Sequence, residues 1–128
     1  MLKETRQAII EIANTTLGQL LEGHNRNTWV ATGFILSKPK FIVNDKNGFE
    51  SCIFTLHQMG ILNDKSLYDK ALPIMIMSKK LINEFRELKK VCFVAIRCTI
   101  EYQEKKKMLS ARLSKCKVLY SMEKELCD

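Results

Sequence analysis

The chain has 128 residues, of which 46% are hydrophobic and 27% charged, and its formal net charge is +7. This composition excludes a disordered tail and fits one globular domain that can bury a core without disulfides or metals. No apolar run approaches the roughly 20 residues that span a bilayer, and the polar start does not resemble a signal peptide. We therefore expect an intracellular, cytoplasmic protein with no membrane partner.

The cysteine and histidine patterns argue against a disulfide framework, a metal site and an enzyme. The five cysteines are odd in number and contain no Cys-x-x-Cys pair, so we expect mostly small buried thiols. His24 and His57 have no carboxylate or cysteine at a recognised catalytic spacing, and the sequence has no glycine-rich phosphate loop. We expect no catalysis, no cofactor and no small-molecule substrate.

The positive charge is confined to residues 28–128, because basic and acidic side chains cancel in the first 27 residues. Within it, one basic stretch contains no acidic residue and comprises Lys105, Lys106, Lys107, Arg112, Lys115 and Lys117. A basic surface of this kind favours a polyanion such as nucleic acid. The alternative is a solvated, lysine-rich face in a protein of basic composition.

The first predicted element is an amphipathic helix over residues 3–21, within an N-terminal segment of residues 1–26. Its apolar side chains recur at spacings of three and four residues and are Ala8, Ile9, Ile12, Ala13, Leu17, Leu20 and Leu21. Gly23 and the asparagines after it end the helix. The apolar stripe fits packing on the same chain, which is the commoner use, or self-association.

Two long strands and a turn are predicted next. The first strand covers residues 28–37 and bends at Lys38-Pro39, because a central strand cannot hold a proline, before residues 41–43 continue it. The Asn47-Gly48 pair is a strong hairpin signal. The second strand then covers residues 49–57.

The second half of the chain is predicted to contain three more strands and one helix. In chain order we expect a loop at 58–70, a strand at 71–77, a helix at 79–90 capped by Ser78, a strand at 91–102, a charged hairpin tip at 103–107 and a strand at 108–120. Residues 123–128 are expected to fray. Three strands, a helix and two strands are the order of the OB-fold, a five-stranded Greek-key barrel that binds oligonucleotides. We predict a mainly β protein with an OB-fold domain at 27–121 and a short C-terminal tail at 122–128.

Four segments resemble the bacterial single-stranded-DNA-binding protein family in the correct order. The segments read NTWVATGFILSKP at 27–39, NG at 47–48 with FTL at 54–56, PIMIMSKKL at 73–81, and LKK at 88–90 with VAI at 94–96. The family's stacking tryptophans are absent, and Ala71, Met77 and Tyr102 lie in those neighbourhoods. The resemblance therefore indicates a divergent member, carried by a plasmid, phage or transposon.

The resemblance implies binding by base stacking and phosphate neutralisation, with little sequence preference. The candidate residues are aromatic residues beside lysines and the basic residues of two hairpin tips: Lys38, Lys40, Phe41, Lys46, Phe49, Tyr68, Tyr102, Lys105, Lys106, Lys107 and Arg112. The other phenylalanines, Phe34, Phe54, Phe85 and Phe93, fit the core, and Trp29 fits the core and a protein interface equally.

The expected partner is single-stranded DNA, protected or organised during replication, recombination or transfer. Members of the family commonly work as oligomers, so we also expect a homo-oligomer. Two alternatives stay open, namely an OB-fold module that binds another protein and an OB domain that binds RNA.

Overall fold

The computed structural model describes residues 3–22, 27–61, 67–105 and 107–128, with the backbone alone at residues 3, 59–61, 67 and 68. The elements in chain order are α1 (Lys3–Leu21), β1 (Thr28–Ile35), β2 (Lys40–Val43), β3 (Glu50–Ile61), β4 (Leu67–Ile76), α2 (Lys79–Arg86), β5 (Lys90–Gln103) and β6 (Met108–Glu125). Within these ranges no helix is long and apolar enough to cross a membrane.

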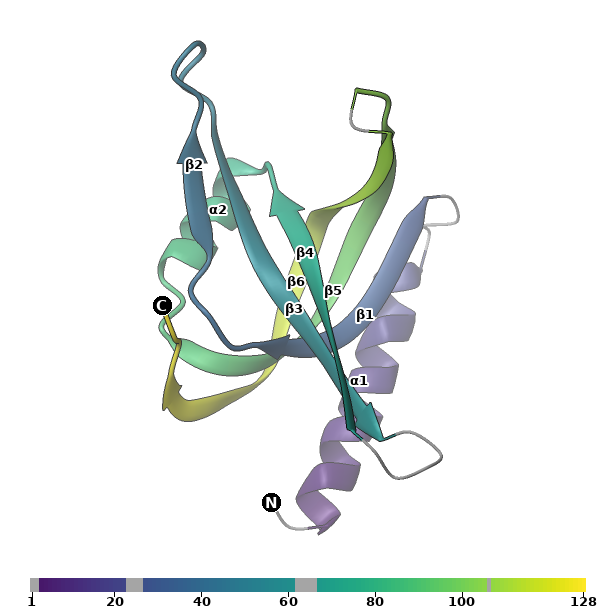
Figure 1. Cartoon of the computed structure of the whole chain (residues 1–128). Helices are drawn as coiled ribbons and strands as arrows, with labels where there is room; N and C mark the ends of the chain where they lie inside the picture. Colours follow the sequence, from purple (N-terminus) through teal and green to yellow (C-terminus); the bar gives the residue numbers. More distant parts are fainter. Residues whose placement is uncertain (1–2, 23–26, 62–66, 106) are drawn as a thin grey trace.

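The strands form a closed barrel (Figure 1). β1 pairs with β5, β5 with β6, and β3 with β4, all antiparallel, whereas β4 and β6 pair in parallel through Met75 and Arg112. β1 also pairs with β3 through Phe34 and His57, which closes the ring. β1 and β2 are two halves of the first predicted strand, separated at Pro39. The predicted five-stranded OB-fold barrel, with a helix between its third and fourth strands, is confirmed.

Helix α2 packs its apolar side chains on the barrel interior. Leu81, Ile82 and Phe85 are buried, and the ring of Phe85 lies 4.8 Å from the ring of Phe54 on β3. The Ser78 hydroxyl accepts a hydrogen bond from the Leu81 amide, which confirms the predicted N-cap. The helix ends at Arg86 and the next strand begins at Lys90, so the predicted helix over 79–90 is too long.

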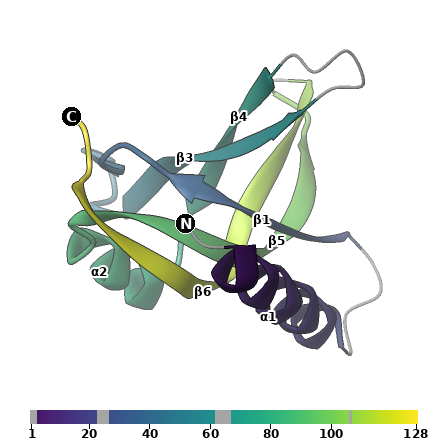
Figure 2. The ribbon, with the colours of Figure 1, turned by 90° about the horizontal axis from the view of Figure 1, so that it is seen from below.

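Helix α1 covers the outer face of β1, β5 and β6 (Figure 2). Ala13, Thr16 and Leu20 are buried there, and the Thr16 hydroxyl donates a hydrogen bond to the Ile12 carbonyl, so its burial leaves no polar atom unsatisfied. Ile12 and Leu21 are exposed. The predicted stripe is therefore divided between a face that packs on the chain and apolar side chains in contact with solvent.

The predicted loop over 58–70 is wrong at both of its ends. β3 and β4 continue their pairing as far as Ile61 and Leu67, and residues 62–66 lie outside the described residues. The Gln58 amide donates a hydrogen bond to the Thr32 carbonyl of β1 at 3.2 Å. Pairing between strands thus keeps residues 58–61 in an extended conformation although turn-forming residues follow them in the sequence.

The predicted fraying of residues 123–128 is also wrong. β6 runs to Glu125, and Leu126 is buried in the core cluster. The Cys127 amide donates to the Leu36 carbonyl at 3.0 Å, and the Lys38 amide donates to the Cys127 carbonyl at 2.7 Å. The end of the chain is therefore held by backbone hydrogen bonds beside the break between β1 and β2. The domain limits at 27 and 121 stay a prediction.

Candidate nucleic-acid interface

Two hairpin tips project from the same end of the barrel, at the top of Figure 1. The first comprises residues 44–49, between β2 and β3. The Asn44 and Asn47 side chains accept hydrogen bonds from the amides of Lys46 and Phe49, both at 2.9 Å, and Gly48 has a φ of 71°. This loop is longer than the two-residue turn that Asn-Gly suggests, and it leaves the Phe49 side chain 71% exposed.

The second tip joins β5 to β6 and comprises residues 104–107. Lys107 has a φ of 51°, and its amide donates to the Glu104 carbonyl at 3.3 Å. Lys105 is exposed, and Lys106 lies outside the described residues. Just before the tip, Tyr102 is 60% exposed and lies opposite Leu109 in the strand pairing. An aromatic ring and lysines therefore stand together at this tip, as they do at the first.

Several of the predicted cations are free to meet phosphate. Among the described residues, no ion pair involves Lys40, Lys46, Lys105 or Lys107, and all four are exposed. Lys40 lies opposite Ile53 in the pairing of β2 with β3. The charges of Lys46 and Asp45 balance at the first tip, whereas the second tip has three lysines and one glutamate, so the excess of positive charge lies at the second tip and at Lys40 on β2.

Two other predicted cations have acidic partners. Lys38 Nζ lies 2.7 Å from Asp128 Oδ1, and this hydrogen bond and charge raise the pKa of Lys38 and lower the pKa of Asp128. Arg112 Nη2 lies 2.6 Å from Glu101 Oε1. Their charges are compensated within the chain, so a phosphate would have to compete with a carboxylate.

Two predicted aromatic residues, Phe41 and Tyr68, lie within strands and outside the hairpin tips. Phe41 is half-buried against the core, and the Arg86 guanidinium, which also pairs with Glu50, lies over its ring at 4.6 Å. This placement favours a structural role. Tyr68 belongs to β4, and its side chain lies outside the described residues.

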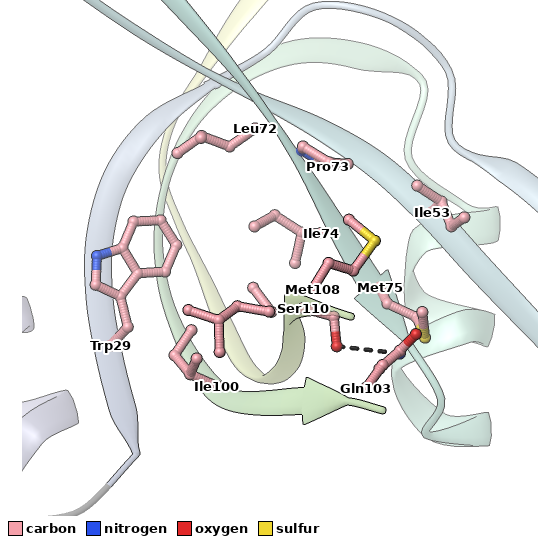
Figure 3. Close-up of a pocket in the computed structure, with 12 residues that line it drawn as sticks. Trp29, Ile53, Leu72, Pro73, Ile74, Met75, Ile100, Gln103, Met108 and Ser110 are labelled. Carbon is pink, nitrogen blue, oxygen red and sulfur yellow. Dashed lines mark hydrogen bonds between the residues drawn. The ribbon is translucent and has the colours of Figure 1, made fainter. Parts of the chain in front are cut away.

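A cavity of about 540 Å³ opens between β4 and the β5–β6 hairpin (Figure 3). Among the described residues β4 and β6 pair at one position, and the cavity lies beside this pair, where the barrel wall is open. Its lining is mainly apolar and comprises Trp29, Ile53, Leu72, Pro73, Ile74, Met75, Ile100, Gln103, Met108, Leu109, Ser110 and Ala111. Sequence reasoning singled out Trp29 alone among these residues, without choosing its role. The signal was a lone tryptophan at the start of a strand of smaller side chains.

A second cavity of about 910 Å³ lies between the start of α1 and the barrel. Phe34 and Phe93 line it with their rings 4.9 Å apart and are half-buried, whereas Phe54 and Phe85 belong to the core as predicted. His57, which also lines it, has its Nδ1 atom 3.2 Å from Asp69 Oδ1.

The cysteines are mostly buried, as predicted. Burial raises the pKa of Cys52 and Cys92 to about 11, and that of Cys98 and Cys116 to about 12, so these thiols stay protonated near neutral pH. Cys127 is exposed. In the part of the chain that is described, no cluster of three histidine, cysteine or acidic side chains could hold a metal ion.

Comparison with known proteins gives matches at the level of structure. No family model and no curated protein matches the sequence. The mitochondrial single-stranded DNA-binding protein Rim1 of Saccharomyces cerevisiae superposes with a TM-score of 0.61 at 14% identity, over 77% of this chain and 99% of that chain. The Plasmodium falciparum single-stranded DNA-binding protein in complex with single-stranded DNA gives 0.57 at 12% identity, over 77% and 96%.

A small single-stranded DNA-binding protein from Streptomyces coelicolor gives a TM-score of 0.51 at 15% identity, over 75% of this chain and 95% of that chain. These proteins are matched over almost their whole length, so the likeness covers the complete barrel. The chain therefore has the OB fold that these single-stranded-DNA-binding proteins have.

Proposed function

We propose that this protein binds single-stranded DNA with little sequence preference, and that it protects or organises the strand during replication, recombination or transfer. The observation that carries the proposal is the barrel end described above. Exposed Phe49 and Tyr102 stand beside lysines without acidic partners among the described residues, on a fold shared with single-stranded-DNA-binding proteins. Bases can stack on such rings while the lysines neutralise phosphates.

The distribution of charge supports this ligand over a neutral one. A single strand offers a phosphate at every nucleotide, and lysines that bind phosphates release counterions from the DNA. Lys105 and Lys107 of the second tip, and Lys40 on β2, neighbour residues that line an apolar cavity, which matches the alternation of charged backbone and uncharged bases along a strand.

Fluorescence anisotropy with a labelled oligo-dT at two salt concentrations tests the proposal. We expect binding at low salt, weaker binding at higher salt and weak binding to duplex of the same length. Absence of binding, or equal affinity for duplex, would favour the protein-interaction module. A matching RNA oligonucleotide decides between the two nucleic acids.

A triple alanine variant of Lys105, Lys106 and Lys107 locates the lysines that bind phosphate. It should weaken binding to every sequence and lower the slope of log affinity against log salt by up to about 2, since each phosphate that a lysine neutralises adds roughly 0.7 to this slope. A matched variant replaces three lysines of the α2 region, Lys79, Lys80 and Lys89, and should leave the slope unchanged. The reverse result would move the basic path to α2.

We also propose that the protein self-associates. Residues 29–31 of β1 pair with β5 on one edge, and on the other edge the described β1–β3 register begins only at Phe34, so this short stretch offers a strand edge to a second copy. Ile12 on α1 is exposed, so its apolar side chain offers a second surface for contact with another copy of the chain. Light scattering of Ile12→Glu should show a smaller assembly if the helix is the contact. A wild-type monomer with and without DNA would reject self-association.

A further inference from the structure

The cavity that holds Trp29 differs from the surface around it because it carries no charge. None of the described side chains that line it is ionisable, although the net charge of the chain is +7. A phosphate would lose its hydration there without gaining a cation. The space therefore suits a neutral, largely apolar group.

The walls of the cavity suit a flat ring. In Figure 3 the indole of Trp29 lies on one side of the cavity and Met75 on the other, and Leu72, Ile74, Ile100 and Met108 are drawn between them. Methionine sulfur makes favourable contacts with aromatic rings, and indole offers a stacking face. At about 540 Å³ the cavity falls within the roughly 300–1,000 Å³ typical of ligand pockets and is larger than a purine.

Two polar side chains lie at one end of this apolar space. The Gln103 amide donates a hydrogen bond to the Ser110 hydroxyl at 3.1 Å (Figure 3). The amide oxygen of Gln103 can still accept, and the hydroxyl proton of Ser110 can still donate. The free acceptor of Gln103 and the free donor of Ser110 can form hydrogen bonds with the polar edge of a base. A purely apolar ligand would leave both of these groups unused.

The lysines that can bind phosphates are neighbours of residues that line the cavity, either along the chain or across the strand pairing. Lys105 and Lys107 belong to the turn between Gln103 and Met108, both of which line the cavity, and Lys40 lies opposite the lining residue Ile53. Positive charge thus borders an uncharged hollow on two sides. A polyanion with uncharged side groups has this pattern, whereas an apolar peptide would gain nothing from the lysines.

We propose that this cavity takes one unstacked nucleobase of a bound single strand, held against Trp29, with its phosphates on the flanking lysines. The inference rests on the proposed function and adds a reason for preferring single strands. A paired base can reach the cavity only by leaving the helical stack, which costs a few kcal/mol. An already unpaired base avoids most of this cost.

The test uses Trp29, which is the sole tryptophan and therefore the only source of indole emission. Labelled oligo-dT is titrated while anisotropy and tryptophan emission are recorded, beside an abasic oligonucleotide of equal length. We expect oligo-dT to change the emission with the same midpoint as the anisotropy. The abasic strand should bind more weakly and leave the emission unchanged.

A variant that fills the cavity, Ala111→Leu, should lose the emission change and bind oligo-dT roughly tenfold or more weakly, as expected for loss of one stacked base. Asn14→Leu, on the exposed side of α1 and on another helix face than Ile12, is the control and should behave as wild type. Circular dichroism checks that both variants fold. If Ala111→Leu does not fold, the titration of the wild-type protein with the two oligonucleotides still tests the inference.

The outcomes separate this inference from the proposed function. DNA binding by anisotropy without an emission change would overturn the inference and leave the function standing, as would an equal emission change with the abasic strand. No anisotropy change with either strand would overturn both. An emission change with a short leucine-rich peptide and none with DNA would assign the cavity to a protein partner.

Discussion

Replacing Leu126 by alanine should destabilise the fold although it lies close to the end of the chain. Its side chain is 5% exposed and belongs to the core cluster, and its amide donates to the Lys89 carbonyl at 2.9 Å. Buried leucine-to-alanine changes cost about 2–5 kcal/mol. Leu126 lies just after the end of β6, where the backbone relaxes more easily than at a mid-strand position, so we expect a loss of about 2–3 kcal/mol, in the lower part of this range.

Urea denaturation followed by circular dichroism measures this loss, and the melting temperature should fall by about 6–15 °C at roughly 3–5 °C per kcal/mol for a chain of this size. Leu109→Ala makes the same chemical change at a side chain that is 66% exposed, and it should change stability by less than about 0.5 kcal/mol. Equal losses for the two variants would show that the chain end does not pack in the core, and the account of its backbone pairing would fail with it.

Three further results are expected. Gly33→Ala should cost about 1–3 kcal/mol in urea denaturation, because a Cβ there would lie 2.7 Å from the Leu56 side chain, whereas Gly18→Ala, which meets nothing within 4 Å on α1, should stabilise. Phe49→Ala should weaken oligo-dT binding in anisotropy and leave the melting temperature unchanged, because its ring is exposed; a lower melting temperature with normal binding would assign the ring to packing. Burial raises the pKa values of the core thiols to about 11 or 12, so these thiols should resist iodoacetamide at pH 8 in mass spectrometry while Cys127 reacts. The free energy of unfolding should fall between about pH 9 and 11, because in this range the thiols ionise in the unfolded chain alone.

Local signals in the sequence predicted most element boundaries correctly. The break at Pro39, the cap at Ser78 and the two strands around the lysine tip each depend on residues close together in the chain. Such signals act through backbone geometry, so they can be read without knowing the fold. The order of these elements was then sufficient to predict the OB-fold.

The errors concern contacts between residues distant in sequence. Residues 58–61 look like the start of a loop because they contain Gly60 and precede the turn formers Asn63 and Asp64, yet pairing with β4 holds them in a strand. Residues 123–128 look like a fraying end because most are charged, yet Leu126 reaches the core and the Cys127 amide bonds to Leu36. Periodicity within a short window does not report such partners.

The candidate site was predictable in its location and less so in its charge. Lysines near hairpin tips can be found in the sequence, and those tips do lie at one end of the barrel (Figure 1). The partners Asp128 for Lys38 and Glu101 for Arg112 follow only from the folded chain. The Trp29 cavity has no sequence signature, because its lining comes from five strands.

Arg112 links the stability of the barrel to its open side. With Met75 it forms the one register pair described between β4 and β6, and its guanidinium pairs with Glu101 on β5. The cavity begins beside this contact, with Met75 and Ala111 both in its lining. Further pairing of β4 with β6 would close the wall and remove the cavity, and breaking the contact would separate the two hairpins that border it. Arg112, predicted as a phosphate ligand, therefore joins β6 to both neighbouring strands beside the opening, through the strand pairing to β4 and through its guanidinium to β5.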